Sequence, residues 1–90
     1  MEIKKEKDGF YIRDSEGNAL GKITYTVSGE DLITVDSTYV SDELRGQGVA
    51  KKLLNELVDW VRKENKKIVP ICSYVKAQMD KNEEYHDVKA

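Results

Sequence analysis

Hydrophobic and polar residues alternate along the first half of the chain, as in strands that bury one face. The clearest alternation runs from Leu20 to Val27. Its apolar positions are Ile23, Tyr25 and Val27. Because successive side chains of a strand point to opposite faces, these three residues share one face. We therefore expect a half-buried strand here.

Three further strand candidates flank this segment: Ile3–Lys7, whose pattern is weak, Phe10–Arg13, and Leu32–Val40, which is rich in β-branched residues. Short turn signals separate the four candidates: Asp8-Gly9, Glu16-Gly17-Asn18 and Ser28-Gly29-Glu30. Turns this short join neighbouring strands that run in opposite directions. The first half of the chain is therefore predicted to be a four-stranded antiparallel meander.

The period of the pattern changes at Val49. The apolar residues that follow are spaced by three, four and seven: Val49, Ala50, Leu53, Leu54, Leu57, Val58, Trp60 and Val61. This spacing places them on one face of a helix that ends near Asn65. Charged and amide side chains fill the other face, so we expect an amphipathic helix packed on the sheet.

The last third of the chain is predicted to contain a strand, a short helix and a tail. Ile68–Cys72 is a short apolar strand, and its Pro70 belongs at an edge or a bulge because proline cannot donate to a ladder. A weaker helical pattern runs from Tyr74 to Lys81. The polar residues Asn82–Ala90 are expected to form a loosely held tail.

The element order is therefore β-β-β-β-α-β-α. The fourth strand, the long helix and the fifth strand form a βαβ unit, so these two strands should be parallel. We expect one α+β domain over residues 1–90, with helices packed on a mixed sheet.

Composition narrows the possible functions. The chain has 90 residues and a net charge of −2, which argues against nucleic-acid binding. Cys72 is the only cysteine, so we expect no disulfide within the chain and no structural zinc site or other metal. The charged N-terminus does not resemble a signal peptide, and no apolar run approaches the ~20 residues of a membrane span. We expect a cytoplasmic protein without membrane partners, as a monomer or weak dimer.

Gly46 and Gly48 stand between the end of a strand and the start of the long helix. A helix start has unpaired amides and partial positive charge, and glycines allow close approach, so the segment could bind a phosphate. Arg45 adds a cation. Alternatively, the glycines form a plain turn that Ser41 and Asp42 cap. The spacing fits neither a P-loop nor the dinucleotide fingerprint.

The segment Arg45-Gly46-Gln47-Gly48-Val49-Ala50 resembles the Arg/Gln-x-x-Gly-x-Gly/Ala loop of the GCN5-related N-acetyltransferases. The likeness is closest to a small, truncated branch of that superfamily, through Thr38–Leu53 and Pro70–Val75. It extends over roughly residues 10–85. The implied fold is a four-strand meander followed by the βαβ unit, and the implied cofactor is acetyl-CoA.

The resemblance also implies where the cofactor binds. The strands Leu32–Val40 and Ile68–Cys72 would splay apart and admit the pantetheine arm between them. Backbone groups of Thr38, Tyr39 and Val40 would pair with its amides. The pyrophosphate would lie on the loop, whose implied contacts are Arg45, Gly46, Gln47, Gly48, Val49, Ala50 and Lys51.

Cys72 is the implied catalytic residue, either as a nucleophile that takes the acetyl group or as a proton donor to the CoA thiolate. A lone cysteine is also often simply buried packing. This chain departs from the branch at Ser37, where relatives carry a histidine. A serine is a poor general base near neutral pH, so Asp36, a tail residue, water or no base remain open. His86 lies in the tail, away from the family position.

The function that the resemblance implies is acetyl transfer from acetyl-CoA to a primary amine, by direct attack or through acetyl-Cys72. The alternative is a non-catalytic acyl-CoA or CoA-binding module that kept the pocket and lost the base. A third interpretation is an interaction domain in which residues 45–50 are only a turn. The acceptor stays open between a small molecule and a protein.

Overall fold

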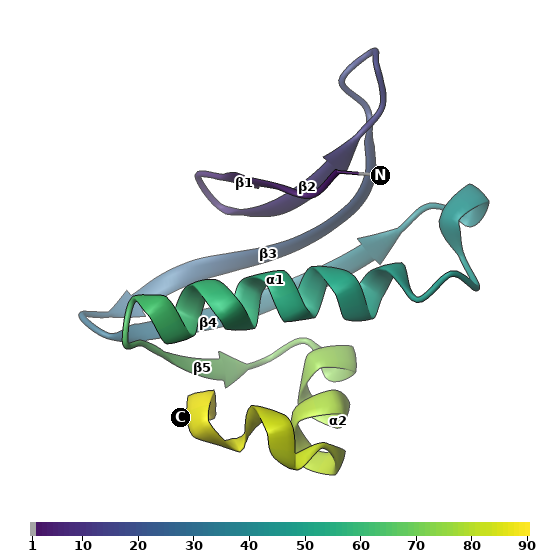
Figure 1. The fold of residues 1–90 in the computed structure, drawn as a ribbon. Helices are drawn as coiled ribbons and strands as arrows, with labels where there is room; N and C mark the ends of the chain where they lie inside the picture. Colours follow the sequence, from purple (N-terminus) through teal and green to yellow (C-terminus); the bar gives the residue numbers. More distant parts are fainter. Residues whose placement is uncertain (1) are drawn as a thin grey trace.

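Five strands form one sheet in the computed structural model, which describes residues 2–90, in the order β1-β2-β3-β4-β5 (Figure 1). Their bounds are β1 Lys4–Glu6, β2 Gly9–Arg13, β3 Ala19–Gly29, β4 Leu32–Val40 and β5 Lys67–Pro70. The pairs from β1 to β4 are antiparallel, and β5 joins β4 in parallel. The predicted meander, parallel pair and α+β class are confirmed.

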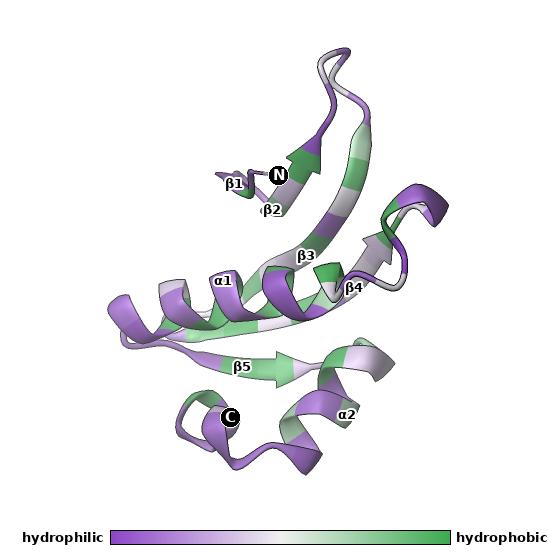
Figure 2. Cartoon of the chain, turned by 45° about the vertical axis from the view of Figure 1, so that its right-hand side comes forward, coloured by the Kyte–Doolittle hydropathy of each residue, from purple (hydrophilic) through white to green (hydrophobic). Residues whose placement is uncertain are grey.

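Helix α1, Val49–Lys63, lies across β3 and β4 (Figure 1). Hydrophilic and hydrophobic residues alternate along this helix (Figure 2), and its buried residues are all apolar: Val49, Leu53, Leu54, Leu57, Val58 and Val61. The helix ends in a Schellman motif: Asn65 adopts a left-handed φ of 54°, and the amide of Lys66 donates to the carbonyl of Val61 at 3.0 Å. No helix within residues 2–90 is both long enough and apolar enough to cross a membrane.

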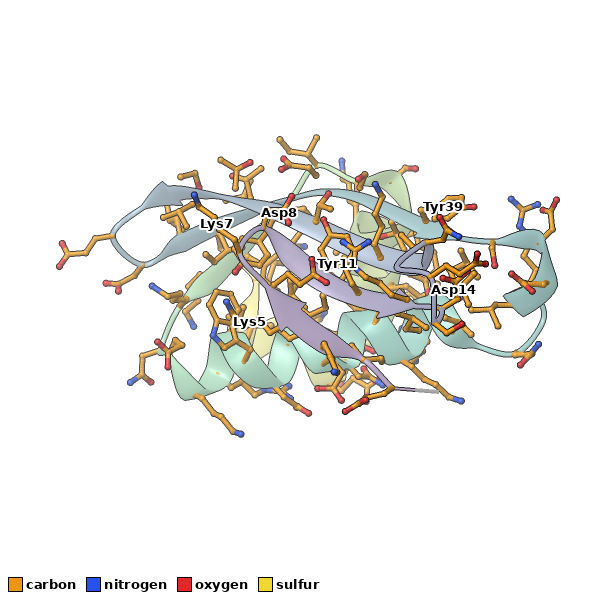
Figure 3. The ribbon with its side chains drawn as sticks, turned by 90° about the horizontal axis from the view of Figure 1, so that it is seen from above. Lys5, Lys7, Asp8, Tyr11, Asp14 and Tyr39 are labelled. Atoms are coloured by element: carbon orange, nitrogen blue, oxygen red, sulfur yellow. The ribbon has the colours of Figure 1, made fainter. Side chains whose placement is uncertain are left out.

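Trp60 joins α1 to the start of the sheet. Its ring stacks on Tyr25 with centroids 5.0 Å apart and meets Phe10 edge-on at 6.1 Å. Lys5 points to this side of the sheet and places its ammonium 4.7 Å from the Trp60 ring centroid (Figure 3). Val27, predicted to share the buried face of Tyr25, is instead 63% exposed, two residues before the end of β3.

The fifth strand is shorter than the sequence predicts. Pro70 is its last residue and lies opposite Val35, at the edge of the five-stranded sheet. The expected edge position of this proline is therefore confirmed. The strand ends before Cys72 because the chain turns there into helix α2, Ser73–Lys81, which confirms the weaker helical pattern.

The expectation of a loosely held tail is wrong. Residues Glu83–Val88 form a 3₁₀ helix, η2, in which Tyr85 and Val88 are each only 2% exposed. The Tyr85 hydroxyl donates to Asn55 of α1 at 2.6 Å. The last residue returns to the outer edge of β5, where the amide of Ala90 donates to the carbonyl of Ile68 at 2.9 Å. Two apolar side chains are enough to anchor this otherwise polar segment.

Replacing Tyr85 with alanine should lower the free energy of unfolding by about 3 kcal/mol, because it leaves a cavity where an aromatic side chain was buried. Urea denaturation measures the change. The matched control is His86→Ala, an exposed neighbour in the same 3₁₀ helix, which should change stability by less than about 0.5 kcal/mol. Equal effects of the two substitutions would show that the tail is not packed as described.

Candidate functional site

The parallel pairing between β4 and β5 ends about halfway along β4. Their pairing ends where Val35 lies opposite Pro70, although β4 continues beside β3 to Val40. Beyond that point the amides of Ile71 and Cys72 both donate to the Val35 carbonyl, at 3.2 and 3.1 Å. The second half of β4 therefore has a strand on one side only. Its other edge faces a gap, as the sequence analysis expects.

Thr38 and Cys72 face each other across this gap. The Thr38 hydroxyl oxygen lies 3.5 Å from the Cys72 sulfur, and both residues are half-buried. Cys72 is also the N-cap of α2, and its carbonyl accepts from the amide of Lys76 at 2.9 Å. The dipole of α2 therefore directs partial positive charge towards the residue that carries the thiol.

A β-bulge at Asp36 decides which way the β4 side chains point. Thr24 of β3 lies opposite Ser37 and Tyr25 lies opposite Val35, which leaves Asp36 as an extra residue. The Ser37 hydroxyl is 2.8 Å from the Thr24 hydroxyl, and Thr26 donates to the Asp36 carboxylate at 2.7 Å. Asp36 and Ser37 therefore share the exposed face of the sheet, whereas simple alternation separates them.

Tyr39 belongs to the same exposed region. It is 45% exposed and lies near the end of β4 that leads to the loop, far from the β1–β2 turn that Asp8 marks (Figure 3). Its register partner on β3 is Lys22, whose other neighbour is Tyr11 of β2. The Tyr11 hydroxyl donates to Asp8 at 2.8 Å, so this tyrosine is engaged within its own hairpin.

The loop before α1 depends on two glycines in left-handed backbone conformations. Gly46 has φ +81° and Gly48 has φ +71°. Gly48 is the N-cap of α1, and no side chain caps the helix. The first turn of the helix also contains no acidic residue. Amides at the start of α1 are therefore left without a side-chain acceptor, beside the partial positive charge of a helix of 15 residues.

Side chains of the loop hold its backbone in place. Arg45 pairs with Asp42 at 2.9 Å, and its Nε donates to the Val40 carbonyl at 3.4 Å. Gln47 donates to the carbonyl of Glu43 at 3.2 Å. Asp42 begins the short 3₁₀ turn η1, Asp42–Leu44, whose N-cap Ser41 makes no side-chain capping bond. The side-chain cap that the alternative, plain-turn interpretation gives to Ser41 is therefore not formed, and Arg45 and Gln47 contact the loop backbone instead.

A shallow hollow of about 190 Å³ connects the loop to the end of β4 and the start of α2. Its lining includes Val40, Gly46, Gly48, Lys51 and Tyr74. Burial raises the pKa of the Tyr74 phenol, so this side chain stays neutral at physiological pH. Tyr74 therefore lines the hollow beside the loop as a neutral phenol.

The tail contributes residues that the sequence analysis does not assign to the site. Glu84 lies 3.4 Å from the ammonium of Lys51, and the Tyr85 ring centroid lies 5.7 Å from the same ammonium. Tyr85 and Glu84 together raise the pKa of Lys51. His86, by contrast, lies on the side of Asp80, whose carboxyl has its pKa lowered first by the hydrogen bond from Lys89 at 2.9 Å and least by His86. No local pattern in the sequence indicates that the tail meets the loop.

The comparisons with known proteins agree with this architecture. Residues 9–88 match the family model of the GCN5-related N-acetyltransferases. The match covers nearly the whole chain, including the β4–α1–β5 unit and its loop. The chain therefore belongs to the GCN5-related N-acetyltransferase family.

A GCN5-like protein from Staphylococcus aureus, solved by NMR, shares 47% identity and a TM-score of 0.84, with 99% of this chain and 87% of that chain covered. The GNAT family N-acetyltransferase YhbS of Escherichia coli, crystallised with CoA, shares 26% identity and a TM-score of 0.58, over 69% of this chain and 38% of that chain. Among curated relatives, the chain spans 74% of mouse Protein NATD1 at 26% identity. It spans 33% of an uncharacterized N-acetyltransferase of Methanocaldococcus jannaschii.

Substitutions at Gly48 test the loop geometry. Gly48→Ala should lower the free energy of unfolding by about 1 kcal/mol, because an L-residue with a Cβ is strained at positive φ. Gly48→Asn should cost less, since asparagine tolerates the left-handed region. Thermal unfolding followed by circular dichroism compares the two variants. If alanine proves no worse than asparagine, the left-handed assignment at this residue is incorrect.

Proposed function

We propose that this protein binds acetyl-CoA and transfers its acetyl group to a primary amine. The observation that carries the proposal is the uncapped start of α1 at Gly48, whose amides have no side-chain acceptor and which borders a hollow. The lining of this hollow includes Val40 and Tyr74. These residues stand two positions along the chain from Thr38 and Cys72, whose side chains meet at 3.5 Å. The CoA-bound YhbS structure supports the choice of ligand.

Binding would begin at the loop. Amides from Gly46 to Lys51 would hold the pyrophosphate, because helix starts and glycine-rich turns present N–H groups to anions. Arg45 would add a charge at the rim. The free edge of β4, at Thr38, Tyr39 and Val40, would pair with the pantetheine amides as a missing strand would. A β4 amide near Val40 would also stabilise the developing oxyanion.

Acetyl transfer needs a proton donor or an acyl carrier at the gap. In direct transfer, the amine nitrogen attacks the thioester carbon, the C–N bond forms and the C–S bond breaks. The Cys72 thiol gives its proton to the CoA sulfur, and the proton that the amine loses returns to the Cys72 thiolate. In the relay, the Cys72 thiolate attacks first and CoA leaves as a thiolate. The amine then attacks acetyl-Cys72, which restores the Cys72 thiolate, and the proton that the amine loses neutralises the CoA thiolate. The Thr38 hydroxyl, 3.5 Å from the sulfur, would orient Cys72 in either case.

The general base is the least constrained part of the proposal. Asp36 offers a carboxylate on the exposed sheet face, next to the point where β4 and β5 diverge. An ammonium acceptor approaching this face would meet that charge and could lose its proton to it. Ser37 makes its side-chain contact with Thr24 instead. The lack of a histidine there favours the second candidate, a module that binds acyl-CoA or CoA without transferring the group.

The phosphate assignment is tested by a charge change at one site. Gly48→Asp should bind CoA roughly tenfold more weakly than Gly48→Asn, because the two side chains have nearly the same shape and only aspartate repels the phosphates. Both residues tolerate the left-handed region, so both variants should fold. Isothermal titration calorimetry measures the affinities. Equal affinities of the two variants would show that the diphosphate does not bind at the loop.

The role of the thiol is tested by Cys72→Ala. We expect acetyl transfer to fall roughly tenfold or more while CoA affinity stays within about twofold. Thiol release is followed with small amines, a lysine peptide and a peptide with a free N-terminus as acceptors. Mass spectrometry of the native protein with acetyl-CoA alone separates the mechanisms, because only the relay leaves acetyl-Cys72. Binding without transfer in the native protein would favour the binding module.

A further inference from the structure

An acidic side chain from the tail lies at the start of α1. Glu84 Oε1 is 3.4 Å from Lys51 Nζ, and Lys51 lines the hollow together with Gly46 and Gly48. The first turn of α1 itself carries no acidic residue. The carboxylate that pairs with Lys51 therefore comes from a segment far away in the sequence.

The backbone of the tail is fixed by contacts that do not involve Lys51. Arg62 donates to the Glu84 carbonyl and makes a two-pronged pair with Asp87 at 2.8 and 2.9 Å. Tyr85 is buried and donates to Asn55 at 2.6 Å. The Glu84 side chain can therefore leave Lys51 by rotating about its own bonds, without any movement of the tail backbone.

We propose that Glu84 is a built-in counter-ion that CoA phosphate displaces from Lys51, and that it sets the affinity of the site. The proposal rests on the function proposed above. In the free protein the Glu84 carboxylate forms an ion pair with the Lys51 ammonium. In the complex Lys51 would turn to a phosphate oxygen, and the Glu84 carboxylate would remain beside a second negative charge.

The solvent exposure of the Lys51–Glu84 pair determines how much Glu84 should change the affinity for CoA. The Lys51 side chain is 43% exposed and the Glu84 side chain 60% exposed. Pairs this exposed contribute little, so exchanging one for a phosphate contact is easy and reversible. Removing the carboxylate should therefore tighten CoA binding by a few-fold.

The test compares Glu84→Gln with Glu83→Gln in calorimetric titrations with CoA at low salt. Glu83 is the adjacent exposed acid of the tail and has no ion-pair partner among residues 2–90. Glu84→Gln should bind CoA about threefold to fivefold more tightly than the native protein. Glu83→Gln should stay within about twofold of the native affinity. Raising the salt concentration should reduce the gain.

Two further measurements separate this proposal from a general charge effect. The gain from Glu84→Gln should disappear in a Lys51→Gln background, because the lysine mediates it. It should also be absent for S-acetylpantetheine, which has the thioester arm but no diphosphate. Equal CoA affinities of Glu84→Gln and Glu83→Gln, or a gain that survives Lys51→Gln, would overturn the proposal. Absence of CoA binding in every variant and in the native protein would instead overturn the proposed function.

Discussion

The carbonyl of Val35 is the point on which the site depends. It accepts hydrogen bonds from the amides of both Ile71 and Cys72, so neither amide is left unpaired where the chain leaves the sheet. This double contact ends the parallel pairing of β4 and β5 and turns the chain directly into α2. Cys72 consequently stands across a gap from Thr38, rather than beside it in a ladder. Had the pairing continued, the edge of β4 would be occupied and no cofactor arm could reach it.

The bulge at Asp36 is the second constraint, and it acts on the same strand. An extra residue reverses the alternation of β4, so Val35 packs in the core while Thr38 still turns towards Cys72. The same shift presents Asp36 and Ser37 together on the exposed face. The bulge thus puts Asp36 and Ser37 on the opposite face of the sheet from Thr38, which contacts the thiol.

Packing of α1 links the two ends of the site. Its apolar stripe locks the helix against the sheet, which holds the left-handed Gly46 and Gly48 in front of an uncapped helix start. The tail uses the same helix as its support, through the buried Tyr85 and the Arg62–Asp87 pair. Glu84 reaches Lys51 because both segments share this helix as a platform. The loop and the tail are therefore held in place by the same helix.

The sequence by itself determined the elements of the fold, because their signals are local. Alternation, short turns and the period of α1 predicted five strands and two helices in the right order. The Gly46–Gly48 segment and Cys72 could also be singled out from residue type and motif. The polar composition of the tail led to the wrong prediction that it is loosely held. Its two buried apolar residues, Tyr85 and Val88, do not form a periodic pattern that could have indicated packing.

Only the tertiary structure decided how these residues meet. The bulge at Asp36 depends on which β3 residue each β4 residue faces, and a one-residue shift there changes every later side chain. The contact between Lys51 and Glu84 depends on where the tail packs after α2 ends. Such contacts join segments that are distant in the chain, and their geometry is set by the packing of the whole core rather than by any local pattern.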